Sequence, residues 1–158
     1  LVDARFVRRR TDEELRTCSA KVRLALEDDY PGNGPRAVFV TDIFEPCWIY
    51  ASAPVAGATR IAIDVGQIPF NFQVGKDVEQ IRFRPPATPD GEFEVRSGRC
   101  DGERIAVLPL ATARTNPGVT RLVAPIVARN GNQDLCITYT ATGVNPMWAL
   151  DSVELLAE

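Results

Sequence analysis

Four cysteines carry the most distinctive chemistry of this 158-residue chain: Cys18, Cys47, Cys100 and Cys136. They lie far apart and form no Cys-x-x-Cys pair, which disfavours a zinc site or a thioredoxin-like redox centre. An even number of widely spaced cysteines is typical of disulfide-bonded proteins from oxidising compartments. Of the three possible pairings we favour Cys18–Cys47 and Cys100–Cys136, because each joins positions that flank strands close together in the sequence. This hypothesis predicts a periplasmic or secreted protein; four free thiols in a reducing compartment are the alternative.

Groups that could catalyse a reaction are few. The chain has no histidine, which removes the commonest general base and a frequent metal ligand. None of its four serines lies in a Gly-x-Ser-x-Gly motif. Glu92, Glu94, Asp101 and Glu103 could supply the paired carboxylates of a glycosidase, but no aromatic sugar site flanks them. We therefore predict that this chain has no catalytic residues.

Two groups of aromatic residues could bind a ligand. Trp48 and Tyr50 are two residues apart, so on a strand both rings point to one face, either as a sugar-stacking platform or as core. Phe70 and Phe72 also share a face and alternate with amide side chains, which suits sugar hydroxyl and acetamido groups or contact with another domain. The predicted carbohydrate-binding or domain-contact residues are Trp48, Tyr50, Phe70, Asn71, Phe72 and Gln73, with plain packing as the alternative.

A few carboxylates could bind a metal ion. Glu27, Asp28 and Asp29 follow the first long extended run, and Asp151 lies alone in the apolar surroundings of the last one. Hard oxygen ligands of this kind suit calcium. A structural calcium ion is the one cofactor that we consider, and a solvated polar turn is the alternative.

The elements that must position these residues have the pattern of strands. Short runs of alternating apolar residues are separated by turns rich in Gly, Pro, Asn and Asp, and the chain has 12 Pro and 11 Gly. The expected strands begin with one from Lys21 onward and continue at 37–43, 47–53, 58–65, 78–83, 92–96, 104–108, 119–127, 135–141 and 148–156. This number and spacing predict an all-β jelly-roll β-sandwich.

The N-terminal segment has a different pattern. Thr11 and Glu14 form a capping box with acids in the first turn, which predicts a short helix over residues 11–17. We therefore divide the chain into a lead-in at residues 1–20 and a β-sandwich module at residues 21–158.

The last expected strand contains a change of phase. Trp148 and Leu150 share one parity, whereas Val153 and Leu155 share the other. A β-bulge near Asp151 would bring both sets into one core. We expect Trp148 to be a core residue.

Composition excludes several partners. The net charge of −3 argues against nucleic acid, and the basic run at residues 8–10 is an isolated one that we interpret as a solvated face. No apolar stretch approaches the roughly 20 residues of a membrane span. The chain begins with Leu1 and shows no signal-peptide pattern, so we expect it to be cut from a longer protein.

Several segments, taken in order, resemble the galactose-binding-like modules related to family 6 carbohydrate-binding modules. They are Cys47–Ile63, Gly91–Arg96, Gly102–Pro109 and Asp134–Glu154. In those modules, acids of the first and closing strands hold a structural ion, and Glu27 and Asp151 match two of the positions. The resemblance therefore implies that Glu27 and Asp151 bind the calcium ion, although Ala25 stands in place of a further first-strand Glu.

A second resemblance covers nearly the whole chain and points to a parent protein. The segments that carry it look like the non-catalytic C-terminal region of bacterial family 20 β-N-acetylhexosaminidases. They are Leu26–Asp29, Cys47–Tyr50, Gly66–Gln73, Gly102–Ala106, Asp134–Cys136 and Pro146–Asp151. This implies a non-catalytic accessory domain of an exported glycoside hydrolase. Its partners would be the catalytic barrel of the parent enzyme and N-acetylglucosamine-containing glycans.

Departures from the family-6-like pattern affect the sugar cleft. The turn that carries a Trp in those modules reads 115–120 here and has no aromatic residue, and Ala149 stands where they have a sugar-binding Asn. These differences favour packing on the catalytic barrel over sugar binding. An adhesion or oligomerisation module without sugar affinity is the alternative function.

Overall fold

The computed structural model describes residues 8–11, 15–18, 23–27, 38–42, 47–68, 85–115, 119–141 and 147–156. Within these residues the chain forms eleven strands and one helical turn. In chain order they are β1 (Arg8–Thr11), β2 (Arg16–Thr17), β3 (Arg23–Glu27), β4 (Val38–Asp42), β5 (Cys47–Pro54), β6 (Arg60–Ile68), β7 (Glu92–Ser97), β8 (Glu103–Pro109), α1 (Ala111–Arg114), β9 (Thr120–Pro125), β10 (Asn132–Tyr139) and β11 (Met147–Leu156).

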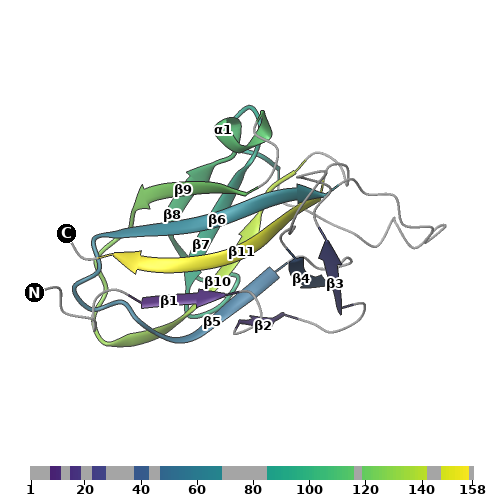
Figure 1. Ribbon diagram of the computed structural model, residues 1–158. Coiled ribbons are helices and arrows are strands. Elements are labelled where there is room, and N and C mark those ends of the chain that lie inside the picture. Colours follow the sequence, from purple (N-terminus) through teal and green to yellow (C-terminus); the bar gives the residue numbers. More distant parts are fainter. Residues whose placement is uncertain are drawn as a thin grey trace, which may run out of the picture.

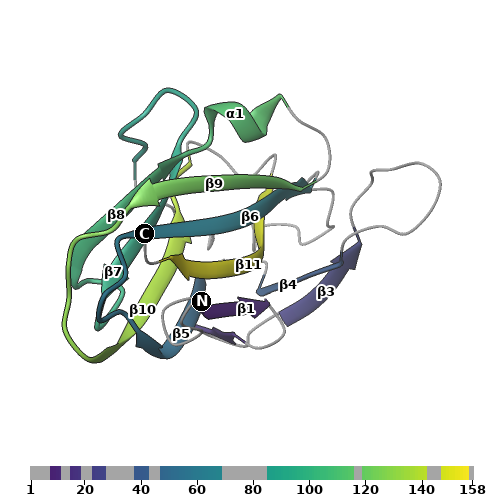
Figure 2. The ribbon, with the colours of Figure 1, turned by 60° about the vertical axis from the view of Figure 1, so that its left-hand side comes forward.

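The strands form two packed antiparallel sheets and a separate hairpin. One sheet has the order β1-β11-β6-β9, and the other has the order β2-β5-β10-β7-β8. The two layers face each other in Figures 1 and 2, and β3 pairs with β4 beside them. The predicted all-β sandwich is therefore confirmed. Nine of the eleven strands, β3 to β11, coincide with expected strands, whereas β1 and β2 were not expected. The strand expected at 78–83 lies outside the described residues.

The prediction of a helix over residues 11–17 was wrong at both of its ends, residues 11 and 15–17, which the structure describes. Thr11 is the last residue of β1, which pairs with β11, and Arg16–Thr17 forms β2, which pairs with β5. Between the two edge strands, Leu15 is 3% exposed and belongs to the core. Ladder hydrogen bonds and this burial outweigh the local preference of a capping box, which stabilises a helix by only about 1 kcal/mol.

Aromatic side chains fill the space between the sheets. Trp48 of β5, Phe93 of β7 and Tyr139 of β10 are almost fully buried, and their rings are in contact, with centroids 6.2 Å apart for Trp48–Phe93 and 5.4 Å for Phe93–Tyr139. Burial is the main influence on the Tyr139 hydroxyl and raises its pKa above the usual value. Buried aliphatic residues of β6 and β11, such as Ile61 and Val153, complete the core from the other sheet.

The predicted bulge in the last strand is confirmed. The pairing of β11 with β6 shifts register between Leu150 and Ser152. Trp148 and Leu150 before the shift, and Val153 and Leu155 after it, are all buried. The extra residue at Asp151 therefore lets two sets of opposite parity face one core.

A buried carboxylate closes one end of the five-stranded sheet. Glu92 begins β7 with no exposed surface, and its carboxylate accepts hydrogen bonds from the backbone N–H groups of Ala87 and Thr88 at 3.1 and 2.9 Å. The hydroxyls of Thr88 and Thr140 also donate to it, each at 2.9 Å. Burial raises the pKa of Glu92, but these hydrogen bonds together outweigh it, so the pKa lies below its usual value.

We predict that Glu92→Gln destabilises the fold by about 1–3 kcal/mol at neutral pH, because hydrogen bonds to a charged acceptor are lost. Since the folded-state pKa is lowered, this stabilisation is complete above the unfolded pKa and is lost as the pH falls through the folded value. Urea unfolding of the wild type and the variant from pH 3 to 7 measures this contribution. The difference between their free energies of unfolding should shrink toward low pH.

Glu103→Gln is a matched control for this prediction, because its side chain is 62% exposed and pairs with Arg129 at the surface. Exposed ion pairs contribute about 0–1 kcal/mol. A Glu92→Gln variant as stable as the control at pH 7, or a difference independent of pH, would contradict the assigned role.

Candidate functional site

The first predicted aromatic pair lies in the core. Trp48 is fully buried and Tyr50 is 2% exposed, both on the inner face of β5. The structure thus corrects the idea of a surface platform: rings enclosed between two sheets cannot stack on a sugar. Because neighbouring side chains on a strand point to opposite faces, the outward residues of β5 are Cys47 and Ile49.

The second predicted group, Phe70, Asn71, Phe72 and Gln73, lies outside the described residues. Every aromatic side chain whose burial is described, at positions 48, 50, 93, 139 and 148, is buried. The large apolar side chains that are exposed in this part of the chain are instead three valines, Val119, Val123 and Val127, on and beside edge strand β9.

The predicted calcium ligands lie on β3 and β11. Glu27 ends β3, and its side chain is outside the described part of the structure. Asp151 is half-buried at the bulge of β11. Asp28 and Asp29 also lie outside the described residues.

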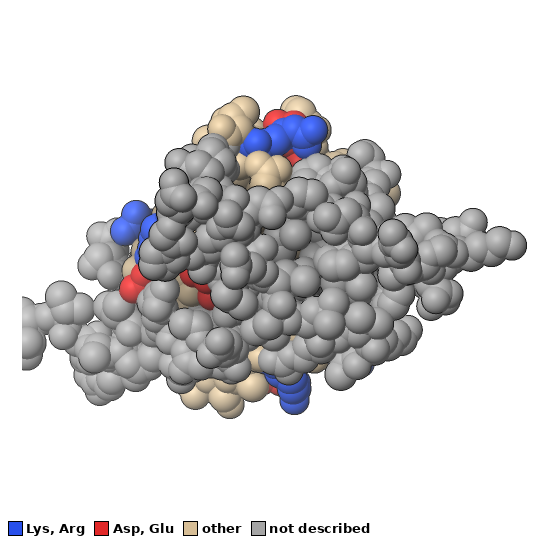
Figure 3. Space-filling view, turned by 45° about the vertical axis from the view of Figure 1, so that its right-hand side comes forward, with Lys and Arg blue, Asp and Glu red and all other residues tan. Residues whose placement is uncertain are grey.

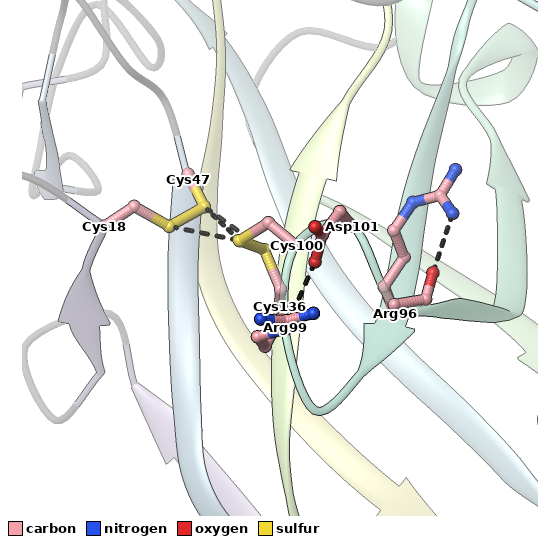
Figure 4. Close-up of a disulfide and its surroundings, with 8 residues drawn as sticks. Cys18, Cys47, Arg96, Arg99, Cys100, Asp101 and Cys136 are labelled. Atoms are coloured by element: carbon pink, nitrogen blue, oxygen red, sulfur yellow. Dashed lines mark hydrogen bonds and ion pairs between the residues drawn. A yellow bond between two sulfur atoms is a disulfide. The ribbon is translucent and has the colours of Figure 1, made fainter.

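All four cysteines gather on the outer side of the five-stranded sheet. Cys18 is bonded to Cys47 and Cys100 to Cys136, which are the two expected pairs. Figure 4 shows the four side chains converging from β2, β5, the turn after β7, and β10. The pairs close loops with sequence separations of 29 and 36, so each stabilises the fold by about 4 kcal/mol in the chain-entropy model.

A surface pocket of about 470 Å³ lies over the cysteines. Its lining includes Cys18, Cys100, Arg16, Arg99 and Asp134. Arg99 forms an exposed ion pair with Asp101, with 3.4 Å between Nε and Oδ1. This pocket could not be predicted from the sequence, because its walls come from β2, β5, β10 and the turn between β7 and β8.

An unusual backbone conformation contacts Asp134 of the pocket lining. Ser52 has φ of 52°, the one positive value for a residue other than glycine in the described part of the chain. Its N–H donates to Oδ1 of Asp134 at 2.8 Å, and its carbonyl accepts from the side-chain amide of Asn132 at 3.4 Å. A left-handed serine costs about 1–2 kcal/mol, which these bonds offset while they orient the Asp134 carboxylate.

The acids considered as catalysts are engaged elsewhere. Glu94 is 3% exposed, and its carboxylate lies 3.1 Å from Arg104 and 3.5 Å from Arg96. Arg96 and Arg104 are directly opposite in the β7–β8 ladder, so Glu94 offsets the repulsion between two like charges. Glu92 is buried among hydrogen-bond donors, and Asp101 and Glu103 form ion pairs with arginines. These four residues do not form the paired, accessible carboxylates that a glycosidase requires.

A second polar network covers the outer face of the other sheet. Arg121 of β9 pairs with Asp64 at 3.3 Å and with Glu154, and the hydroxyl of Ser152 donates to Asp64 at 2.8 Å. The hydrogen bond to Glu154 is the main cause that raises the pKa of Arg121. On the face shown in Figure 3, described cationic and anionic side chains lie side by side in small groups, so no large field of one sign arises from them.

Comparisons with known proteins identify the fold. No family model matches the chain. No curated protein sequence matches it either. Among solved structures, a β-1,3-glucan-binding family 6 carbohydrate-binding module from Bacillus halodurans has a TM-score of 0.60 at 13% identity, over 95% of this chain and 96% of that chain. A family 6 module from Clostridium cellulolyticum, in complex with xylose, has a TM-score of 0.60 at 14% identity over 92% and 94%.

A larger enzyme contains a part with a similar fold. The family 43 arabinoxylan arabinofuranohydrolase from Bacillus subtilis, in complex with cellotetraose, matches 96% of this chain with 27% of its own length, at 14% identity and a TM-score of 0.56. The chain therefore has the β-sandwich fold of family 6 carbohydrate-binding modules, a fold that also occurs as one part of a glycoside hydrolase.

We predict that Trp48→Ala lowers the free energy of unfolding by about 3–5 kcal/mol, because it removes a fully buried ring from the core. Chemical denaturation of the purified chain measures the loss. Val123→Ala, at a position 47% exposed, should change stability by less than about 0.5 kcal/mol. A Trp48→Ala chain with wild-type stability would mean that the ring lies at the surface, as a sugar platform would require.

Proposed function

We propose that this chain is a non-catalytic accessory domain of an exported glycoside hydrolase, and that the parent enzyme is a β-N-acetylhexosaminidase. The observation that carries the proposal is the match to family 6 carbohydrate-binding modules over more than nine-tenths of both chains. The match to 27% of a family 43 hydrolase supports a place beside a catalytic domain. The β-N-acetylhexosaminidase parent rests on the sequence resemblance alone.

The absence of catalysis is supported by the chain's own residues. The sequence contains no histidine, and the four acids considered above are buried or paired with arginines. A glycosidase needs two carboxylates facing one accessible sugar site. The chain's contribution to hydrolysis is therefore to hold the substrate or to support the catalytic barrel.

Two disulfide pairs support the exported location. Disulfides persist in the periplasm and outside the cell, where thiols are not kept reduced. In the described part of the chain, no helix is long and apolar enough to cross a membrane.

Contact with the catalytic barrel is favoured over a sugar cleft by the described surface. The aromatic rings at the described positions are in the core, whereas sugar binding usually requires exposed rings. The exposed valines Val119, Val123 and Val127 give edge strand β9 an apolar margin that suits contact with another protein domain. Among the aromatic residues predicted to make a contact, Phe70 and Phe72 remain candidates for either kind.

We predict that Phe70→Ala combined with Phe72→Ala separates these two roles. If the rings contact the barrel, the double variant lowers the melting temperature of the full-length enzyme but not that of the isolated chain. If they bind sugar, it abolishes binding of chitooligosaccharides to the isolated chain in titration calorimetry. Burial of two such rings is worth a few kcal/mol, about 100-fold or more in affinity.

Glu103→Gln, at a side chain that is 62% exposed, is a control that should change neither the melting temperatures nor sugar binding. A large loss of stability in the isolated double variant would contradict both roles, because the rings would then be core. Hydrolysis of nitrophenyl β-N-acetylglucosaminide by the isolated chain, abolished by mutation of one of its own acids, would contradict the accessory function itself.

A structural calcium ion is part of this proposal. Glu27 on β3 and Asp151 at the bulge of β11 would hold it through carboxylate oxygens, which are the ligands that calcium prefers. We predict that chelation lowers the melting temperature of the wild type and that Asp151→Ala removes this difference, because an ion bound only by the folded state stabilises that state. Equal melting temperatures with and without chelator would show that no calcium ion stabilises the domain.

A further inference from the structure

The four cysteine sulfurs are closer together than two independent disulfides require. All four Sγ atoms lie within 4.8 Å of one another. Between the two pairs, Cys47 Sγ is 3.3 Å from Cys136 Sγ and 3.5 Å from Cys100 Sγ, and Cys18 Sγ is 3.6 Å from Cys100 Sγ. We propose that, once both disulfides are reduced, these four sulfurs bind a single zinc ion as a tetrahedral four-cysteine site.

The spacing of the sulfurs fits this site. Zinc–thiolate bonds are about 2.3 Å long, so the sulfurs at the corners of a tetrahedral site are about 3.8 Å apart. Three of the four distances between the pairs fall short of this value by about 0.5 Å or less, and the fourth, from Cys18 to Cys136, is at most 4.8 Å. Reduction allows the sulfurs within each pair to separate to the same spacing through side-chain rotation, with the ion at the centre.

Backbone hydrogen bonds hold the four positions independently of the sulfur bonds. Cys47 and Cys136 lie on neighbouring strands β5 and β10, where Cys136 is opposite Ile49. The N–H of Cys18 donates to the carbonyl of Cys47 at 3.2 Å. The N–H of Gly98 donates to the carbonyl of Asp134 at 2.8 Å, which ties the turn that carries Cys100 to β10. The site is therefore preorganised by the sheet.

A glycine completes the turn that presents Cys100. The N–H of Gly102 donates to the carbonyl of Arg99 at 2.9 Å, and a Cβ at position 102 would overlap the carbonyl oxygen of Ser97. The side chain of Arg96 donates to the Gly102 carbonyl at 3.0 Å. This compact turn, visible in Figure 4, brings Cys100 over the sulfur of Cys136.

The surroundings provide access to the sulfurs. Cys47 and Cys136 are buried, whereas Cys18 and Cys100 are half-buried and line the pocket described above, through which a reductant and an ion can enter. A zinc ion with four thiolates has a net charge of −2. Arg16 and Arg99 in the pocket lining bring positive charge near it, while Asp134 in the same lining and Asp101, which pairs with Arg99, bring negative charge. In the part of the chain that the structure describes, no other group of three or more such ligands meets.

The change of state requires a reductant, which we take to be a dithiol. Each protein disulfide accepts two electrons and two protons from one dithiol, which becomes a disulfide, and four protein thiols result from two such steps. Zinc then displaces one proton from each thiol, so binding releases four protons. The same sulfurs thus cross-link the fold as disulfides in an oxidising compartment and bind a metal in a reducing one. This inference does not depend on whether the chain belongs to a glycoside hydrolase.

Cobalt and zinc titration of the reduced 158-residue chain tests the proposal. The chain is reduced with dithiothreitol, freed of reductant without oxygen, and titrated with Co²⁺ and then Zn²⁺. We expect one ion per chain, the visible absorption of tetrahedral cobalt thiolate, its displacement by zinc, and protection of four thiols from a thiol reagent. The absence of histidine simplifies the measurement, because no imidazole competes.

Variants and controls complete the experiment. Cys136→Ser and, at the half-buried position, Cys18→Ser should each weaken zinc binding by more than the 10–100-fold that loss of an outer-shell partner causes. Val123→Ala should leave binding unchanged, because Val123 is an exposed residue of β9 in the other sheet. The unreduced chain should bind no zinc at this site.

Two outcomes would overturn the proposal. One is a reduced, folded chain whose four thiols stay reactive in excess zinc, or whose affinity is unaffected by both serine substitutions. The other concerns a reduced chain that has lost its β-sheet circular dichroism. Because binding and folding are then coupled, zinc should restore that signal. Failure of zinc to restore it would exclude a four-cysteine site.

Discussion

Burial of one face of each strand is the constraint on which the rest of the structure depends. Trp48, Phe93 and Tyr139 occupy the core from three neighbouring strands, and side chains along a strand alternate between its faces. Once these rings are inside, the residues between them must lie outside. The positions of Cys47 and Glu94 on the outer face therefore follow from the packing of the core.

Irregularities in the ladders adjust this alternation where the sequence departs from it. The pairing shifts register between Gln133 and Leu135, between Val95 and Arg96, and between Leu150 and Ser152. At each shift an extra residue reverses which positions of the strand point inward. Apolar residues before and after the shift therefore both face the core. The first shift lies next to the left-handed Ser52 and the pocket over the cysteines, where a bent strand re-aims the Asp134 carboxylate.

Polar chemistry in the described part of the chain is used mainly to stabilise the fold. Glu92 anchors a turn, Glu94 separates two opposed arginines, and Arg121 links β6, β9 and β11 through carboxylates. A buried carboxylate surrounded by donors is stable only while these partners remain, so it cannot serve a substrate. This arrangement is consistent with a domain that acts through its contacts, and it leaves the cysteine cluster as the place where its own residues can change state.

The sequence by itself determined the sandwich, the positions of most strands and the bulge near Asp151, because period-two alternation and turn residues are local signals. It favoured one of three cysteine pairings but did not determine it. It did not determine the edge strands β1 and β2, since a capping box is also local and only pairing with β11 and β5 overrides it. Nor could it decide whether Trp48 and Tyr50 face the core or the solvent, because parity shows that two rings share a face but not which face is buried. The meeting of four sulfurs within 4.8 Å was decided by tertiary structure alone, because it depends on strand order and register across residues 18 to 136.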